Sequence, residues 1–320
     1  MRRFADYVPH GVIPATLLAL HDDFSIDEPG TRRHLRDVAA TPGLSAITVN
    51  GHASEVHACT PEEQQRILDL TLEEVGDRLP TISGVWADGS ANAARIARQA
   101  ASQGASALLV FPSQVFSMGG QLRPEMAVAH FSTIAAATDL PLIVFGYAER
   151  STLSYPLETL VRLAEAVPSI RAIKDWSNDA MLHERQIRTL QGLSRPVNVL
   201  TTHSAWLMAS LALGCNGLLS GSGSIIPDLQ AALWQAVQAG DLHRARTINN
   251  RIYPLAQAFY AAPALDMHNR MKECLVMLGR MDRAVVRPPL VRITDAERER
   301  LRQALKQAGI GENGALNLAA

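Results

Sequence analysis

The chain has 320 residues, of which 47% are hydrophobic, and its 30 Lys and Arg nearly balance its 31 Asp and Glu. This composition provides a large core and excludes a disordered chain. The net charge of −1 gives no overall field to attract nucleic acid or anionic lipid, so neither is expected as a partner. Three cysteines (Cys59, Cys215 and Cys274) without the spacing of a zinc site indicate a reduced, cytoplasmic protein.

The first apolar stretch, residues 11–20, is short, contains Pro14 and is followed by no cleavage site. It predicts a buried strand rather than a signal peptide or a membrane span. Seven more apolar runs follow, and most carry β-branched residues on both faces, as strands covered on both sides do. The eight predicted strands are residues 12–20, 46–51, 79–86, 107–113, 141–147, 170–176, 197–203 and 217–223.

Longer amphipathic stretches separate these runs and carry helix signals. Thr60 and Pro61 have the residue types of an N-cap and a first turn, and Tyr155-Pro156 opens another helix. Gly104 and Gly214 fall where two helices should end. No dinucleotide or P-loop glycine motif follows the first strand.

Eight strands alternating with seven helices predict an α/β protein with a (β/α)8 TIM barrel. Beyond Ser224 the pattern is helical almost throughout. We expect residues 1–235 to form the barrel with the active site, 236–310 to form a small C-terminal helical bundle and 311–320 to form a loose tail.

The active site of such a barrel lies at the carboxyl ends of the strands. Only three of the basic residues are lysines, and we expect Lys272 and Lys306 to lie solvated on helices. Lys174 instead ends the sixth strand, where burial would lower its pKa and expose a nucleophilic amine. The alternative is a structural lysine in a buried ion pair with Asp175 or a glutamate.

The ten histidines give little sign of a metal site. His52, His57 and His203 all follow strand ends and are the one plausible set of three, but no acidic ligands accompany them. His34, His130, His183 and His243 lie in predicted helices and are taken as ordinary. No metal is expected.

Several motifs resemble one family in order and spacing. They are GVIPAT (11–16), NGHASE (50–55), AIKD (172–175), LALGCNGLLSGSGSIIP (211–227) and VRPPL (286–290). Together they are similar to the dihydrodipicolinate synthase / N-acetylneuraminate lyase superfamily of Schiff-base-forming class I aldolases, of which the chain would be a diverged member. The resemblance implies that Lys174 forms an imine with pyruvate or another 2-oxo acid, without an organic cofactor. It also implies a homo-oligomer, a tetramer or a dimer.

The resemblance further implies a set of substrate contacts. Arg150 would hold a carboxylate. Beside the resemblance, we expect the backbone N–H groups at residues 52–54, which include Ala53 and Ser54, to hold the substrate carboxylate. Phe145, Leu219 and Ser220 would line the pocket, and His203 would contact the distal part of the substrate.

Three departures from the family remove its usual hydroxyl relay. Phe145 takes the place of the strand-5 tyrosine, Gln114 takes the place of the tyrosine after strand 4, and the G-[ST]-T-G-E loop reads Gly-His-Ala-Ser-Glu at 51–55. Authentic dihydrodipicolinate synthase activity is therefore not expected. Tyr147 lies two residues beyond Phe145 and so on the same face of a continuing strand. Tyr147 or His52 would supply the acid/base function; alternatively Tyr147 packs beneath a loop and His52 only binds substrate.

Two functions remain open from the sequence. The first is a Schiff-base lyase of a 2-oxo acid, acting by pyruvate-releasing retro-aldol cleavage or by dehydration or deamination of a 3-deoxy-2-oxo acid. The second is a catalytically diminished barrel that still binds a 2-oxo acid at Lys174.

Overall fold

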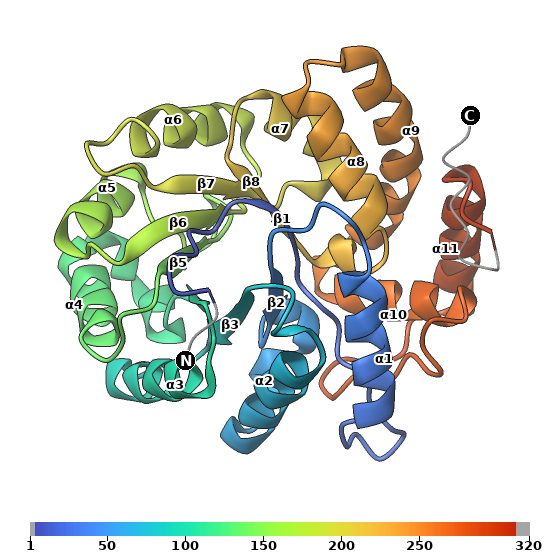
Figure 1. The fold of residues 1–320 in the computed structure, drawn as a ribbon, viewed down its shortest axis with the longest axis horizontal. Helices are drawn as coiled ribbons and strands as arrows, with labels where there is room; N and C mark the ends of the chain where they lie inside the picture. Colours follow the sequence, from blue (N-terminus) through green and yellow to red (C-terminus); the bar gives the residue numbers. More distant parts are fainter. Residues whose placement is uncertain (1–3, 312–320) are drawn as a thin grey trace.

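Eight parallel strands form the centre of the structure, a computed structural model that describes residues 4–311 (Figure 1). They pair in the order β1-β8-β7-β6-β5-β4-β3-β2, and isolated parallel bridges from Val12 to Leu44 and from Ala15 to Thr48 close the sheet between β1 and β2. The predicted TIM barrel is therefore confirmed. The strands are β1 (Gly11–Pro14), β2 (Ile47–Val49), β3 (Thr81–Val85), β4 (Ala107–Val110), β5 (Leu142–Gly146), β6 (Ile170–Asp175), β7 (Asn198–Thr201) and β8 (Gly217–Ser220).

A ring of helices surrounds the barrel, one after each strand (Figure 1). The predicted start and stop signals act as expected: Thr60 caps α2 in a capping box with Glu63, and Gly104 ends α3 in a left-handed conformation (φ 115°). These helices are α1 (Glu28–Ala39), α2 (Pro61–Val75), α3 (Ser90–Gln103), α4 (Pro124–Ala135), α5 (Leu157–Ala166), α6 (Ala180–Leu190), α7 (Leu207–Ala212) and α8 (Pro227–Gln238).

The first strand is shorter than predicted, because the chain leaves the ladder after Pro14. The N–H of Ala15 still bonds to Ser220 on β8, but that of Thr16 bonds to Thr48 on β2 and that of Leu17 to the hydroxyl of Ser224. Residues 15–20 are buried as expected, but they cross from one strand to another rather than extending β1.

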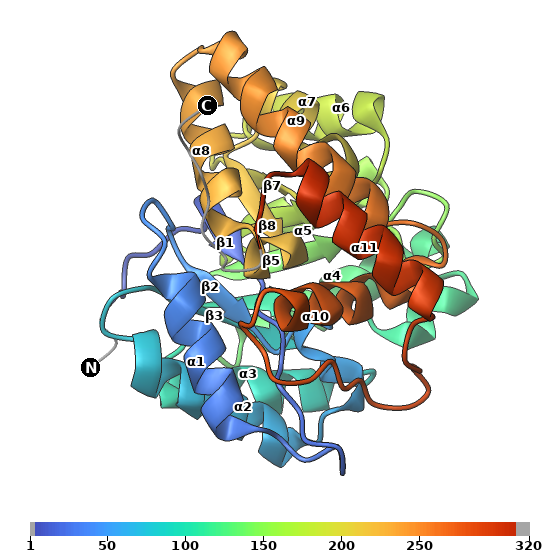
Figure 2. The same cartoon turned by 90° about the vertical axis from the view of Figure 1, so that its right-hand side faces the viewer.

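Three further helices follow the barrel: α9 (Leu242–Phe259), α10 (Met267–Met277) and α11 (Asp295–Gln307). Helix α9 packs on α8 and α11, and α10 packs on α11 and on η6 (Gly221–Ser224), the turn after β8. Figure 2 shows α10 and α11 crossing the side of the barrel. The boundary expected at residue 235 stays a prediction, and the tail expected at 311–320 lies, beyond Gly311, outside the described residues.

One hydrophobic cluster includes both the barrel strands and the C-terminal helices, with Leu255, Leu275 and Leu301 joined to the strand residues. The helices are therefore packed as part of the same core. Among the helices that the structure describes, none has both the length and the apolar character needed to cross a membrane.

The prediction that Lys272 is solvated is wrong. Its side chain is fully buried and forms an ion pair with Glu55, which follows β2, and it also donates to the carbonyl of Val285. The second carboxylate oxygen of Glu55 accepts the N–H of Arg287. Because each charge has a partner, the pair satisfies the condition for burial, and it ties α10 to the loop that carries His52.

Candidate active site

Lys174 lies on β6 in register with Phe145 on β5, so both side chains point to the same face of the barrel. Its side chain is buried, with 7% exposed, and Nζ lies 4.8 Å from the centroid of the Phe145 ring. Burial lowers the pKa of the Lys174 amine to about 7. A large share of this lysine is therefore neutral, and so nucleophilic, near neutral pH.

The ion pair that would make Lys174 a structural lysine is missing from the described residues. Asp175 follows it on the strand and points to the opposite face, where its carboxylate meets His183. No hydrogen bond or ion pair within residues 4–311 involves the Lys174 ammonium, and desolvation is the one cause of its pKa shift. The arrangement is that of an amine kept free for a ligand.

A small cavity of about 40 Å³ opens beside Lys174. A water molecule needs about 10–15 Å³ of such volume, so the cavity has room for only a few water molecules. The lining residues come from the ends of several barrel strands and from the C-terminal segment at 260–268: Ala15, His52, Ala53, Phe145, Lys174, Trp176, Thr202, Gly221, Tyr260, Met267 and His268.

His52 and Tyr147 are joined by a hydrogen bond of 2.7 Å between Nε2 and the phenol oxygen. The imidazole also packs edge-on against Phe111 and Phe145. Burial, with a smaller contribution from the charge of Lys174, holds the pKa of His52 well below its usual value, and burial raises the pKa of Tyr147. Both groups are neutral near pH 7, and their hydrogen bond provides a path along which a proton can pass.

Of the predicted substrate contacts, Ala53 and Phe145 line the same cavity as Lys174. Ser54 is buried, and its hydroxyl donates to the carbonyl of Thr16. Leu219 is buried within β8, and the Ser220 hydroxyl is hydrogen-bonded in a group of buried polar side chains that includes Ser204, Ser222 and Gln230. The structure thus does not bring these last three predicted residues to the cavity wall.

Arg150 lies in a second cavity, of about 470 Å³, formed by the segment after β5 together with α5 and α6. Tyr147 lines this larger cavity as well and, through its bond to His52, connects it to the wall of the Lys174 cavity. Gln114 is exposed in η3 (Gln114–Met118), where its N–H donates to Asp88.

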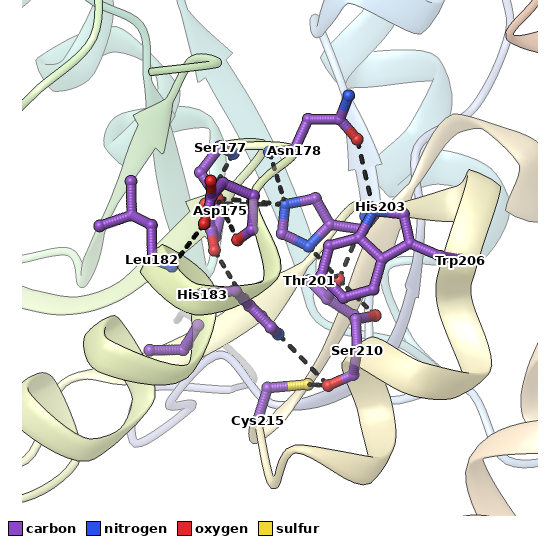
Figure 3. A network of polar contacts seen from close by, with 12 residues as sticks. Asp175, Ser177, Asn178, Leu182, His183, Thr201, His203, Trp206, Ser210 and Cys215 are labelled. Carbon is purple, nitrogen blue, oxygen red and sulfur yellow. Dashed lines mark hydrogen bonds and ion pairs between the residues drawn. The ribbon is translucent and has the colours of Figure 1, made fainter.

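Behind Lys174, on the outer face of β6, Asp175 is the centre of a buried polar network (Figure 3). His183 Nδ1 lies 2.6 Å from the Asp175 carboxylate, and its Nε2 lies 3.2 Å from the carbonyl of Ser210. Both partners can only accept hydrogen bonds, so both ring nitrogens carry protons and His183 is an imidazolium. Burial alone would lower its pKa, but the hydrogen bond that His183 donates to Asp175, with a smaller contribution from Cys215, raises it to about 9.

His203 lies in this network rather than at the cavity. Its Nε2 accepts the N–H of Asn178 at 3.1 Å, its Nδ1 lies 3.1 Å from the hydroxyl of Thr201, and its ring stacks on Trp206 (Figure 3). A nitrogen that accepts an N–H carries no proton, so this ring is neutral, and burial lowers the pKa of His203 to about 4.

Within residues 4–311, Asp175, His183 and His203 are the one set of three potential ligands whose donor atoms lie within 4.8 Å of one another. The predicted set of His52, His57 and His203 does not converge. Each donor atom of the observed set already has a hydrogen-bond partner in the protein. We therefore assign this network to the positioning of β6 rather than to metal binding.

Sequence reasoning missed two features of the site. The sequence places His183 in a helix without indicating a role, since only the packing of α6 on β6 brings it to Asp175. His268 was assigned to a separate helical bundle, and no signal in the sequence shows that α10 reaches the mouth of the barrel.

The His183 imidazolium predicts a pH dependence of stability. Its folded pKa of about 9 lies above the ordinary value of 6.5, so its stabilising effect is full below about pH 6.5 and is lost as the pH rises through about 9. We expect His183→Gln to remove on the order of 3 kcal/mol of this pH-dependent unfolding free energy. Urea unfolding between pH 6 and 10 measures it, with the exposed His243→Gln as control. An unchanged pH slope in His183→Gln would contradict the assignment.

Comparison with known proteins agrees with this architecture. The model of the Dihydrodipicolinate synthetase family matches residues 8–308. A 4-hydroxy-tetrahydrodipicolinate synthase of Gluconacetobacter diazotrophicus is 31% identical over 300 residues, 94% of this chain and 97% of the relative. An uncharacterized DapA-like lyase of Halobacterium salinarum is 30% identical over 303 residues, 94% of each chain.

Solved structures show the same fold. YagE, a prophage protein of the dihydrodipicolinic acid synthase family from E. coli K12 that was solved in complex with pyruvate, is similar with a TM-score of 0.86 at 21% identity, over 94% of this chain and 99% of that one. Dihydrodipicolinate synthase from Thermotoga maritima has a TM-score of 0.85 at 22% identity, over 95% and 99%. The family match and the relatives of 30% identity or more establish that this chain belongs to the dihydrodipicolinate synthetase family.

Proposed function

We propose that this chain is a lyase that forms a Schiff base between Lys174 and a 2-oxo acid. The observation that carries the proposal is a buried lysine without a counter-ion, facing a cavity beside a hydrogen-bonded His–Tyr pair. Family membership supports the same chemistry, since members of this family are lyases, and YagE was solved with pyruvate bound.

The chemistry begins with the neutral amine of Lys174. Its nitrogen attacks the ketone carbon of the 2-oxo acid, and loss of the ketone oxygen as water leaves a protonated imine. This cation draws electrons from the adjacent carbons. It therefore allows either cleavage of the bond between carbons 3 and 4 or loss of water or ammonia from carbon 4 after a proton leaves carbon 3. In the cleavage, the hydroxyl on carbon 4 loses its proton and that part of the ligand leaves as an aldehyde; carbon 3 is then protonated, and water hydrolyses the imine to release pyruvate and Lys174.

Each of these routes needs a group that takes and returns a proton, and His52 and Tyr147 can supply one together. When the ligand loses a proton, the positive charge of the protonated imine passes to this pair, whose partners lie 2.7 Å apart, so no net charge is created in the apolar cavity. This pair would serve in place of the missing hydroxyl relay. Because Phe145 has no proton to move, we infer that the reaction differs from that of authentic dihydrodipicolinate synthase.

The first test is chemical trapping on the whole protein. We expect cyanoborohydride with pyruvate or a 3-deoxy-2-oxo sugar acid to leave one reduced adduct on Lys174, with a yield that rises as the pH passes through about 7. An ordinary lysine would instead require a pH above 10. Intact mass and peptide mapping measure the adduct.

The matched control is Lys306→Ala, which removes an exposed lysine and should leave the adduct unchanged, whereas Lys174→Ala should abolish it. Absence of an adduct with both compounds would overturn the proposal. An adduct that forms stoichiometrically, without turnover of any longer 2-oxo acid, would favour the alternative of a binding protein.

The second test separates imine formation from proton transfer. We expect Tyr147→Phe and His52→Asn to retain the Lys174 adduct but to lower turnover about 10²- to 10⁴-fold, the usual effect of losing an acid/base group. Single-turnover kinetics measures both steps, and Tyr253→Phe, at an exposed tyrosine, is the control. Full turnover in both variants would exclude the pair as the proton relay.

A further inference from the structure

His268, the second residue of α10, reaches the Lys174 cavity from the C-terminal helices. A residue four positions later on the same helix, Lys272, is fixed by its buried ion pair with Glu55, and residues four apart lie on one face of a helix. The ring is therefore held over the mouth of the barrel by the packing of α10.

The space for this ring depends on Gly221 at the end of β8. A Cβ at this position would lie 3.0 Å from His268 Nε2 and 3.3 Å from its Cδ2. A side chain at this position would thus displace the imidazole by a few tenths of an ångström or more. The ring therefore lies directly beside Gly221, and the cavity that it lines is the one that contains Lys174.

The imidazole of His268 is neutral and has no hydrogen-bond partner within the described part of the chain. Burial, together with the charges of Lys174 and Lys272, lowers the pKa of His268 to about 3. A neutral imidazole both donates and accepts, and this half-buried ring at the cavity wall has both groups available to a ligand. A hydroxyl on a bound ligand can donate a hydrogen bond to one ring nitrogen of His268 or accept one from the other.

We propose that His268 determines substrate specificity by hydrogen-bonding a hydroxyl group on the 2-oxo acid held at Lys174. This inference rests on the proposed function and deepens it, because a hydrogen bond to His268 would favour hydroxylated 2-oxo acids over 2-oxo acids with plain hydrocarbon chains. A hydroxyl fits better than a second carboxylate, since a neutral ring brings no charge to offset an anion. The ring lies near the ends of β8 and α10, whereas Tyr147 extends from β5, so the two contact different parts of a ligand.

The test compares two compounds with the same carbon chain: a 3-deoxy-2-oxohexonate, which carries hydroxyls from carbon 4 onward, and 2-oxohexanoate, which carries none. The concentration that gives half-maximal trapping on Lys174 is measured for each. We expect wild type to favour the hydroxylated compound, and His268→Leu to raise its half-maximal concentration about 10- to 100-fold. The value for 2-oxohexanoate should change little.

Two further variants separate a lost contact from a damaged fold. His268→Gln keeps a polar group near the place of Nε2 and should restore most of the preference. Gly221→Ala should lower the preference because its Cβ displaces the ring. Thermal unfolding identifies any of the three variants that fails to fold. The preference for the hydroxylated compound is then compared between wild type and the variants that do fold.

The outcomes distinguish this inference from the function on which it rests. Adducts with both compounds in wild type, but an unchanged preference in His268→Leu or an equal loss for both compounds, would overturn the role of His268 alone. No adduct with either compound in wild type would overturn the Schiff-base function and this inference with it.

Discussion

The structure of the site depends on burying one amine without an opposite charge. Lys174 is enclosed by Phe145 and the other walls of a cavity of about 40 Å³. Removal from water costs an ammonium more free energy than it costs a neutral amine. The protein therefore stabilises the neutral form, which is the form that attacks a carbonyl. The titratable groups near the site add no charge that would stabilise the ammonium: His52, Tyr147 and His268 are all neutral near pH 7.

Charges near the site are kept apart from the amine and paired with one another. Strand alternation puts Asp175 on the outer face of β6, where the His183 imidazolium neutralises it (Figure 3). Lys272 is neutralised by Glu55, and that contact also holds α10 against the loop after β2. If Asp175 faced inward instead, it would hold Lys174 as an ammonium and the nucleophile would be lost.

Much of the fold was predictable because it depends on local patterns. Eight apolar runs and capping signals such as Thr60 indicate the barrel, and Lys174 is recognisable as a rare lysine within a strand. The sequence offers Tyr147 and His52 only as alternative acid/base groups and does not predict the hydrogen bond between them, since β2 and β5 are far apart in sequence. The solvated Lys272 was a wrong prediction for the same reason: its partner Glu55 is 217 residues away. His268 depends on how α10 packs, which no local pattern encodes.

The most direct measurement is the titration of the Lys174 amine itself. Because the chain has only three lysines, labelling them with ¹³C at Cε gives three NMR signals, and Lys174→Ala assigns one of them. The account predicts that this signal titrates near pH 7. A Lys174 that titrates near 10.4, the value of an ordinary lysine, would contradict the claim that burial has made it a nucleophile.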